Sequence, residues 1–445
     1  MKKIGLHVTA GTTIYASTGR FGWNQPDRMS SEGFYLADRG SRITLLDDRY
    51  LFNVATYALT FDEKYLHTYD YEPEESWTTY THDLSGDTYR QDEYVFPGRC
   101  YFRICLKRMD GGNFSEEEAA DIDRIVRYDS DAEEDTQREI FRPEIERAAE
   151  EIAATREQGD LVFAVLTDTH RTVNGTWGTT AANLAELQKL APLDAVIHLG
   201  DFTDGLVSRE LTGSYIRGML DDLRKPGAPI YVIMGNHDSN YFHDNPDVMT
   251  VPEQVALYQS GMDCVKDDSA LPYYYVDFSA ANLRAVFLHT YDNDAVPRYG
   301  FDVPQIEWLD KVLNSTPENY TILLFAHDAP LADLDYWSDV IRGGAALMRV
   351  CEAHQRRVGN ILAYIHGHTH ADYIYTGSAF PIASIGCAKC EYMTDKKPPG
   401  SFTQPRRLGT VSQELWDILI VKPQARRIEC IRFGAGENRQ IVGKG

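Results

Sequence analysis

Leu161-Val-Phe-Ala-Val-Leu-Thr-Asp168-Thr-His170 is the stretch that decides how this chain folds. Its apolar, partly β-branched beginning is typical of a buried strand in a parallel sheet. Asp168 and His170 follow where that strand should end, and both are side chains that bind metal ions. The stretch therefore predicts a sheet whose strand ends carry metal-binding residues.

The same arrangement returns four times further along the chain. Predicted strands come before four more motifs: Gly200-Asp201-Phe-Thr-Asp204, Gly235-Asn236-His237-Asp238, the single His327, and Gly367-His368-Thr-His370. We expect buried strands at 161–167, 194–199, 229–234, 283–289, 320–326 and 361–365, with helices between several of them, as at 181–190 and 208–223. Such alternation predicts an α/β domain that binds its ligands at the carboxyl ends of the strands. Two later strands, expected at 415–421 and 427–433, should complete a sheet of this domain.

The five motifs, in this order, resemble those of the calcineurin-like metallophosphoesterases, and the resemblance covers roughly residues 157 to 440. It implies a four-layer α/β/β/α sandwich of two mixed sheets between helical layers, built around a dinuclear metal site. The segment Gln305-Ile-Glu-Trp-Leu-Asp-Lys-Val-Leu is similar to the helix before the lone histidine in the purple-acid-phosphatase and cyclic-nucleotide-phosphodiesterase branches. That similarity favours a small substrate.

The resemblance also implies a ligand set for two metal ions. The first ion would be held by Asp168, His170, Asp201 and His370, and the second by Asp201, Asn236, His327 and His368. Asp201 would bridge the two ions. Independently of the resemblance, a carboxylate can donate one oxygen to each of two cations and hold them about 3.5 to 4 Å apart, which suits attack on a phosphoryl centre.

The donor types narrow the choice of metal and predict its chemistry. Imidazole, carboxylate and amide ligands without a thiolate favour manganese, iron or zinc over a closed structural zinc site. Only two anionic side chains serve two cations, so the centre stays positive. It could then bind a phosphate and lower the pKa of a bridging water, which would supply hydroxide for in-line attack.

Two further residues are expected to take part in catalysis. His237 follows the ligand Asn236 directly, so its imidazole should lie beside the metals and act as general acid or transition-state stabiliser. Asp204, in the matching family position, would hydrogen-bond that imidazole and orient it. Four other histidines match no ligand position and are expected in the core or at its rim, although His243 or His289 could line the substrate pocket: His198, His243, His289 and His366.

Charge and cysteine content bear on partners and compartment. A formal charge of −23 disfavours a protein that binds nucleic acid through its phosphates. The seven cysteines are scattered, which predicts reduced thiols and a cytoplasmic location, although export stays open. Cys387-Ala-Lys-Cys390 is a lone CxxC, for which a structural role is favoured over a redox one. The start Met1-Lys-Lys is not followed by a typical secretory leader, and no apolar run approaches the roughly 18 residues of a membrane span.

We predict three parts along the chain. Residues 1–112 carry short aromatic and β-branched runs, which predict a small β-sandwich. Its aromatic residues, including Trp23 and Trp77, could form a face for a glycan or protein ligand or could simply fill the core. Residues 113–158 are acidic and helix-favouring, as expected of a connector. Residues 159–445 would form the metallophosphoesterase domain.

These observations predict a dinuclear-metal-dependent hydrolase of a small phosphoester, with a phosphodiester favoured over a phosphomonoester. One alternative is a DNA exonuclease of the same family, which the acidic charge disfavours. Another is a protein that binds a glycan or a partner and carries a vestigial phosphoesterase domain. The intact set of ligands argues against that loss of activity.

Overall fold

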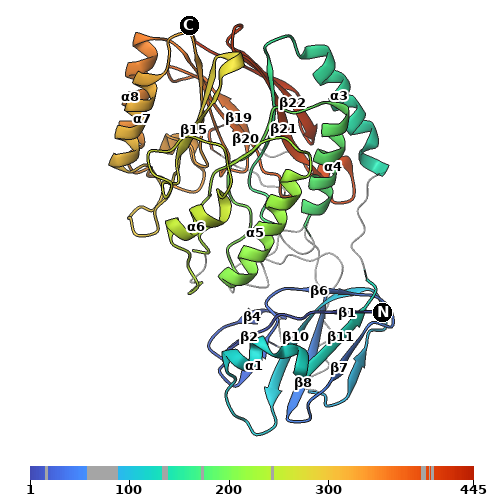
Figure 1. Cartoon of the computed structure of the whole chain (residues 1–445). Helices are drawn as coiled ribbons and strands as arrows, with labels where there is room; N and C mark the ends of the chain where they lie inside the picture. The colour runs from blue at the N-terminus through green and yellow to red at the C-terminus, as the bar shows by residue number, and fades with distance from the viewer. Residues whose placement is uncertain are drawn as a thin grey trace. The chain divides into compact units, whose positions relative to one another are not determined.

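The computed structural model describes residues 1–15, 19–57, 89–132, 139–171, 175–241, 245–391, 397–399, 401 and 405–444. His243 and Trp77 lie outside these residues. The chain divides into two units (Figure 1), the first mainly residues 1–135 and the second mainly residues 136–445. In the described ranges, every helix is too short or too polar to cross a membrane.

The first unit is built mainly from antiparallel strands. One sheet has the strand order β1-β11-β7-β9, and a second has β2-β5-β10-β6 with β8 paired to β10. Side chains from both sheets, such as Ile43, Phe52, Phe102 and Tyr128, share one buried cluster. The elements are β1 (Lys2–Ile4), β2 (Thr9–Ala10), β3 (Thr13–Ile14), β4 (Phe21–Gly22), β5 (Arg28–Ser30), β6 (Tyr35–Ala37), β7 (Arg42–Leu45), β8 (Tyr50–Tyr57), β9 (Glu93–Val95), β10 (Cys100–Arg108), α1 (Glu116–Ala120), α2 (Ile122–Ile125) and β11 (Val126–Ser130).

The segment predicted as a helical connector, 113–158, is divided between the two units. Its helices α1 and α2 and its strand β11 belong to the first unit, where β11 pairs with both β1 and β7. The 3₁₀ turn η2 (Glu139–Phe141) and helix α3 (Arg142–Thr155) belong to the second unit. Alternating burial in β11 places Val126 and Tyr128 in the core, so this strand completes the sandwich of the first unit.

The second unit contains two six-stranded mixed sheets among its described residues. The first has the order β14-β13-β12-β21-β22-β23, and the second has β15-β16-β17-β18-β20-β19. The strands are β12 (Leu161–Leu166), β13 (Ala195–His198), β14 (Ile230–Val232), β15 (Tyr274–Phe278), β16 (Leu283–Phe287), β17 (Thr321–Phe325), β18 (Ile361–His366), β19 (Asp372–Tyr375), β20 (Ile382–Ile385), β21 (Leu415–Lys422), β22 (Arg427–Gly434) and β23 (Arg439–Val442).

Helices pack against the outer faces of these sheets (Figure 1). Apolar side chains of α3, α4 (Trp177–Leu190), α5 (Arg209–Arg224) and α6 (Val251–Tyr258) share a cluster with the first sheet. Those of α7 (Val303–Ser315) and α8 (Gly344–Arg357) share another with the second sheet. A third cluster, with Phe163, Phe287 and Leu419 among its members, joins the two sheets to each other.

The parallel strands bring the sequence motifs to common sheet edges. Strands β12, β13 and β14 run parallel in one sheet, and β16, β17 and β18 do so in the other. Their carboxyl ends lead into the loops that carry Asp168, Asp201, Asn236, His327 and His368. The predicted strands and helices of this domain are therefore confirmed within a few residues of their predicted ends.

Candidate metal centre

The backbone of the motif loops is held in an unusual conformation. Five predicted ligands have a left-handed backbone: Asp168 (φ 50°), His170 (38°), Asp201 (55°), His368 (62°) and His370 (54°). For residues with a Cβ this conformation is uncommon, and it persists only where surrounding contacts impose it. One such contact is the hydrogen bond from the amide of Asp168 to the carbonyl of Gly200, at 2.9 Å. Backbone strain is therefore found at five of the seven metal ligands that the sequence predicted.

Glycines in the motifs allow these loops to approach one another. A Cβ added at Gly235 would collide with the carboxylate of Asp201 and the ring of His327. A Cβ at Gly367 would collide with Thr167 and the carboxylate of Asp168. These two glycines, before Asn236 and His368, are therefore needed for space, and a larger residue would separate the ligands.

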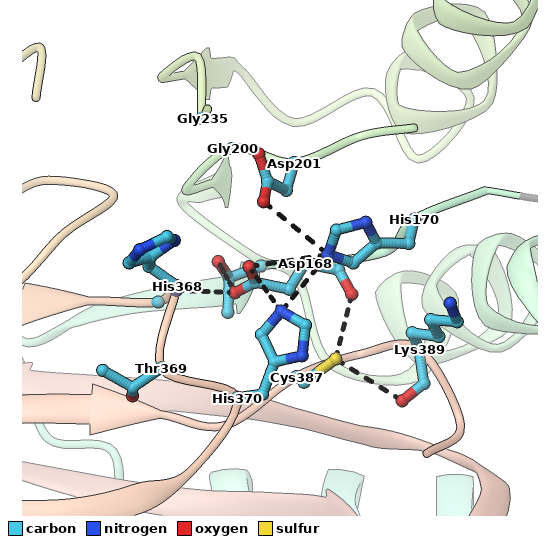
Figure 2. Close-up of polar contacts among 12 residues, drawn as sticks. Asp168, His170, Gly200, Asp201, Gly235, His368, Thr369, His370, Cys387 and Lys389 are labelled. Carbon is cyan, nitrogen blue, oxygen red and sulfur yellow. Dashed lines mark hydrogen bonds and ion pairs between the residues drawn. The ribbon is translucent and has the colours of Figure 1, made fainter. Parts of the chain in front are cut away.

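Asp168, His170 and His370 form a first buried group of donor atoms (Figure 2). Nε2 of His370 lies 3.2 Å from Nε2 of His170 and 3.2 Å from Oδ1 of Asp168. The other oxygen of Asp168 accepts a hydrogen bond from the amide of His368 at 2.9 Å. One oxygen of Asp168 thus faces the group while the other fixes the carboxylate in the loop.

Asp201, Asn236, His327 and His368 come together in a second group beside the first. Nε2 of His327 lies 3.3 Å from Oδ2 of Asp201 and 3.1 Å from Oδ1 of Asn236. Asp201, His327 and His368 each place a donor atom within 4.8 Å of the other two. The structure therefore brings all seven predicted ligands to one place.

Asp201 lies between the two groups, but through a single oxygen. Its Oδ2 is 3.6 Å from Nε2 of His170 in the first group and 3.3 Å from Nε2 of His327 in the second. Its Oδ1 accepts a hydrogen bond from the amide of His237 at 2.9 Å. Oδ2 therefore faces both groups, while Oδ1 is hydrogen-bonded to the loop of His237.

Two of the ligand histidines are oriented by a hydrogen bond at Nδ1, and a third has a carboxylate close to the same atom. Nδ1 of His327 contacts the carbonyl oxygen of Leu199 at 2.8 Å, and Nδ1 of His370 contacts the carboxylate of Glu391 at 2.5 Å. Nδ1 of His170 lies 3.0 Å from the carboxylate of Asp204. An acceptor at Nδ1 places the ring proton there and leaves the lone pair of Nε2 directed into the groups. These rings are therefore prepared to bind a cation.

His237 lies at the edge of these groups, and its orientation differs in one respect from the prediction. The main-chain carbonyl of Asp204, rather than its side chain, contacts Nδ1 of His237, at 2.8 Å. Nε2 of His237 is 3.9 Å from Oδ2 of Asp201. The chain turns at Gly205 (φ 67°), and the carboxylate of Asp204 contacts His170. The side chain of Asp204 thus lies against a predicted ligand.

Asp238 is the last residue of the motif Gly235-Asn-His-Asp, and the motif alone predicted no role for it. Its buried carboxylate accepts hydrogen bonds from the amides of Asp201 (2.9 Å), Phe202 (2.9 Å) and Gly235 (2.8 Å). Burial and the nearby charge of Asp201 raise the pKa of Asp238 to about 7. The residue fixes two motif loops to each other. Its position in the Gly-Asn-His-Asp motif was the only sequence signal for this role.

The segment of the CxxC motif borders the first group, which the sequence did not reveal. The thiol of Cys387 donates to the carbonyl of Asp168 at 3.2 Å, and the amide of Lys389 donates to the same oxygen at 3.0 Å (Figure 2). Nζ of Lys389 is 3.9 Å from Asp204. All seven cysteines of the chain are free thiols. The thiol of Cys387 thus contacts the loop that carries Asp168 and His170.

Among the described residues, three of the histidines that matched no ligand position are buried: His198, His289 and His366. His198 contacts the hydroxyl of Thr169 at 3.1 Å, and His366 contacts the hydroxyl of Tyr373 at 2.8 Å. Burial lowers the pKa of His198 to about 3 and those of His289 and His366 to about 4. These three are neutral at physiological pH and do not enter the two groups.

The two groups of donors form an electrostatic site for positive charge. Burial alone would lower the pKa of His327, but the carboxylate of Asp201 outweighs that effect and raises it to about 10. Without a bound cation, a proton on the ring would compensate the buried carboxylates. The donors present, which are imidazole, carboxylate and amide, suit manganese, iron or zinc.

The arrangement is that of a metal-dependent hydrolase of phosphoesters, and comparison with known proteins agrees. Residues 161–372, just under half of the chain, match the family described as calcineurin-like phosphoesterase. This range includes all nine predicted site residues. Residues 161–372 thus match a calcineurin-like phosphoesterase domain, which supports a metal-dependent phosphoesterase. No curated protein matches its sequence.

Several solved structures resemble the fold at low sequence identity. A dimetal phosphatase from Danio rerio is 16% identical, with a TM-score of 0.49, over 64% of this chain and 99% of its own. Purple acid phosphatase PPD1 from yellow lupin (Lupinus luteus) is 10% identical, with a TM-score of 0.43, over 98% of this chain and 73% of its own. GAP50 from Plasmodium is 11% identical, with a TM-score of 0.41, and the match covers 64% of this chain and 90% of GAP50. These likenesses are distant, and the family assignment rests on the match of residues 161–372.

Proposed function

We propose that the chain hydrolyses a small phosphodiester with two metal ions, and that it prefers phosphodiesters to phosphomonoesters. The observation that carries the proposal is the position of Asp201, whose Oδ2 lies 3.6 Å from His170 in one donor group and 3.3 Å from His327 in the other. A carboxylate oxygen between two sets of ligands is what a dinuclear centre requires. Purely structural carboxylates are instead satisfied by hydrogen bonds to both oxygens.

The proposed ligands are the two groups described above. Asp168, His170, Asp201 and His370 would hold the first ion, and Asp201, Asn236, His327 and His368 the second. Manganese, iron or zinc would bind the phosphate oxygens there and lower the pKa of a water shared between them, which would supply hydroxide at neutral pH.

The residues of the chain would then orient the reaction. Asp201 accepts a hydrogen bond from the amide of His237, so the loops of the proposed bridging ligand and catalytic histidine are joined. His237 would donate a proton from Nε2 to the leaving oxygen, since its Nδ1 contacts the carbonyl of Asp204. Asp238 would keep both loops in place through its three amide contacts.

The charges around the centre support the preference for a diester. A phosphomonoester carries up to two negative charges at neutral pH, so its binding needs more positive charge than a diester needs. The guanidinium of Arg298, which is near Asn236, already donates to the carbonyl oxygens of Asn236 (2.8 Å) and Tyr241 (3.0 Å). Nζ of Lys389 faces the carboxylate of Asp204 at 3.9 Å. Both cations near the centre therefore face acceptors of the chain itself.

The four-layer α/β/β/α order is part of the same proposal. It is supported by three apolar clusters, one between the sheets and one under each set of helices. That order would place the motif loops of both sheets at one edge, where the donors meet.

The test is hydrolysis of bis-p-nitrophenyl phosphate and of p-nitrophenyl phosphate by metal-stripped protein to which manganese, iron or zinc is restored. We expect activity only with metal, a higher kcat/KM for the diester, and loss of activity in Asp201→Asn. Asp333→Asn, an exposed carboxylate, is the matched control. A higher kcat/KM for the monoester would contradict the diester preference, and inactivity on both esters with two ions bound would contradict the general proposal.

The two alternative functions give different outcomes in the same preparation. An exonuclease would degrade single-stranded DNA at physiological salt, whereas we expect no degradation because of the charge of −23. A binding protein with a vestigial domain would bind a glycan or protein and hydrolyse neither ester with any metal.

A further inference from the structure

Asp328, at the carboxyl end of β17, has a buried side chain that the proposed ligand set does not use. It follows His327 directly and is 0% exposed. Neither of its carboxylate oxygens has a hydrogen-bond partner among the described residues. An ionised carboxylate buried without a partner is unfavourable, so such a group either binds a proton or faces a cation.

No arginine or lysine supplies that charge in the described part of the chain. There, the ion-pair contacts of Asp328 are with two histidines that are themselves proposed metal ligands, His327 and His368. Arg298, the nearest candidate, directs its guanidinium at the main-chain oxygens of Asn236 and Tyr241 and at Asn293. A metal ion held by His327 and His368 would place a positive charge next to Asp328.

The distances place Asp328 within reach of the second ion. Its Oδ1 lies 3.9 Å from Nε2 of His327 and 3.7 Å from Nδ1 of His368. Ligand atoms about 2.1 Å from one ion lie at most about 4.2 Å from each other. Both distances are within that limit, so Asp328 is close enough to share an ion with either histidine.

Asp335 occupies the other side of His368. Its Oδ1 lies 3.7 Å from Nε2 of His368 and accepts a hydrogen bond from the amide of Trp337 at 2.8 Å. His368 thus has a carboxylate near each ring nitrogen, with Asp328 at Nδ1 and Asp335 at Nε2. A carboxylate behind the nitrogen that does not bind the metal is the usual partner of a ligand histidine.

We infer that Asp328 is an additional carboxylate ligand of the second metal ion, next to Asp201, Asn236, His327 and His368. The inference rests on the proposed function, because it uses the same second donor group. Asp328 would be the third carboxylate of the centre, after Asp168 and Asp201. The net charge of the centre would then be lower by one than with the seven ligands alone. A less positive centre disfavours a dianionic monoester more than a monoanionic diester. The substrate preference would then have its origin at Asp328.

The experiment measures metal binding by the full chain. Metal-stripped wild type, Asp328→Asn, the control Asp333→Asn and the ligand variant His327→Ala are titrated with Mn²⁺ by calorimetry, and bound metal is counted by mass spectrometry after dialysis. We expect two ions in wild type and in Asp333→Asn. In Asp328→Asn we expect the weaker-binding ion to lose at least about tenfold in affinity.

Thermal unfolding of the same proteins separates a ligand from a merely structural carboxylate. Metal-free Asp328→Asn should be about as stable as wild type, because neither carboxylate oxygen makes a hydrogen bond to the described residues that the change would remove. The Tm of Asp328→Asn should rise less than that of wild type when Mn²⁺ is added. A ligand that binds only the folded protein stabilises it less when its affinity is lower. A lower Tm without metal, together with an unchanged rise, would overturn the inference.

The remaining outcomes are also decisive. Two ions bound with unchanged affinity in Asp328→Asn would overturn this inference and leave the proposed function intact. A third ion in wild type that is lost in Asp328→Asn would assign the residue to a separate site and would overturn it too. Wild type that binds no Mn²⁺, zinc or iron would contradict the proposed function itself. As a second readout, the ratio of diester to monoester kcat/KM should fall in Asp328→Asn.

Discussion

Nδ1 of His237 lies 2.8 Å from the main-chain carbonyl oxygen of Asp204. A carbonyl can only accept a hydrogen bond, so Nδ1 carries a proton, and the proposed exchange of a proton with a substrate falls to Nε2. Because the partner is the main chain, this orientation does not depend on the identity of side chain 204. Replacement of His237 should therefore affect catalysis, whereas replacement of the side chain of Asp204 should not disturb this contact.

Replacement of His237 by alanine should lower kcat by about 10² to 10⁴, the usual range for loss of a general acid. The two ions should stay bound, because the ring points at the edge of the groups and its nearest predicted ligand oxygen is 3.9 Å away. Steady-state kinetics and metal content by mass spectrometry check both parts. Loss of an ion in His237→Ala would show that the ring is a ligand instead.

Replacement of Asp204 by asparagine should act on metal binding rather than on the catalytic proton. The carboxylate lies 3.0 Å from Nδ1 of His170, and changes behind a ligand histidine typically weaken metal affinity by about 10 to 100-fold. At saturating metal the pH dependence of kcat should stay that of wild type. A pH profile shifted in Asp204→Asn, with unchanged metal affinity, would mean that this side chain acts on His237 after all.

Replacement of Gly235 by alanine should disrupt both donor groups at once. The added Cβ would collide with Asp201 and His327, and these belong to the backbone-fixed part of the site. We expect loss of the second ion and a lower Tm. Gly218→Ala, in helix α5, where a Cβ would contact nothing within 4 Å, is the control and should be neutral or slightly stabilising. Equal metal contents in the two variants would contradict the steric argument.

The sequence predicted the strands and ligands of this domain because both depend on short-range patterns. A β-branched run followed by Asp-x-His or Gly-Asp is visible in a few residues, and β12, β13, β17 and β18 lie where those runs predicted them. The contacts made by Asp204 were not predictable in the same way. Whether its carbonyl or its carboxylate faces His237 depends on the turn at Gly205.

Asp328, Asp335 and Glu391 escaped the sequence reasoning for a related reason. None of the three belongs to one of the five motifs. Their contacts with the proposed ligands form only through folding, as that of Glu391 with His370 does. A single acidic residue in a loop has no pattern that separates it from a solvated one. Only its burial and its missing partners in the structure distinguish Asp328.

The last prediction concerns the ion-pair network that joins the two sheets of the second unit. Arg432 on β22, with a side chain that is 1% exposed, donates to Asp417 on β21 at 2.9 Å and to both oxygens of Asp372 on β19 at 2.6 and 2.9 Å. Arg432→Met would leave both carboxylates in the interior with Arg439 as their remaining charged partner. Removing one member of a buried ion pair typically costs about 3 to 5 kcal/mol, so urea unfolding should show a loss of that size.

The same network predicts how stability depends on pH. Burial alone would raise the pKa of Asp372, but Arg439 and Arg432 outweigh it and hold that pKa below its ordinary value of 3.8. A carboxyl group with a lowered pKa stabilises the fold above its unfolded-state value and loses that contribution as the pH falls toward its folded-state value. Asp372→Asn should therefore be less stable than wild type at pH 7, and the difference should narrow below about pH 4. A difference that stays constant down to pH 3 would mean that Asp372 acts through its shape and hydrogen bonds rather than through its charge.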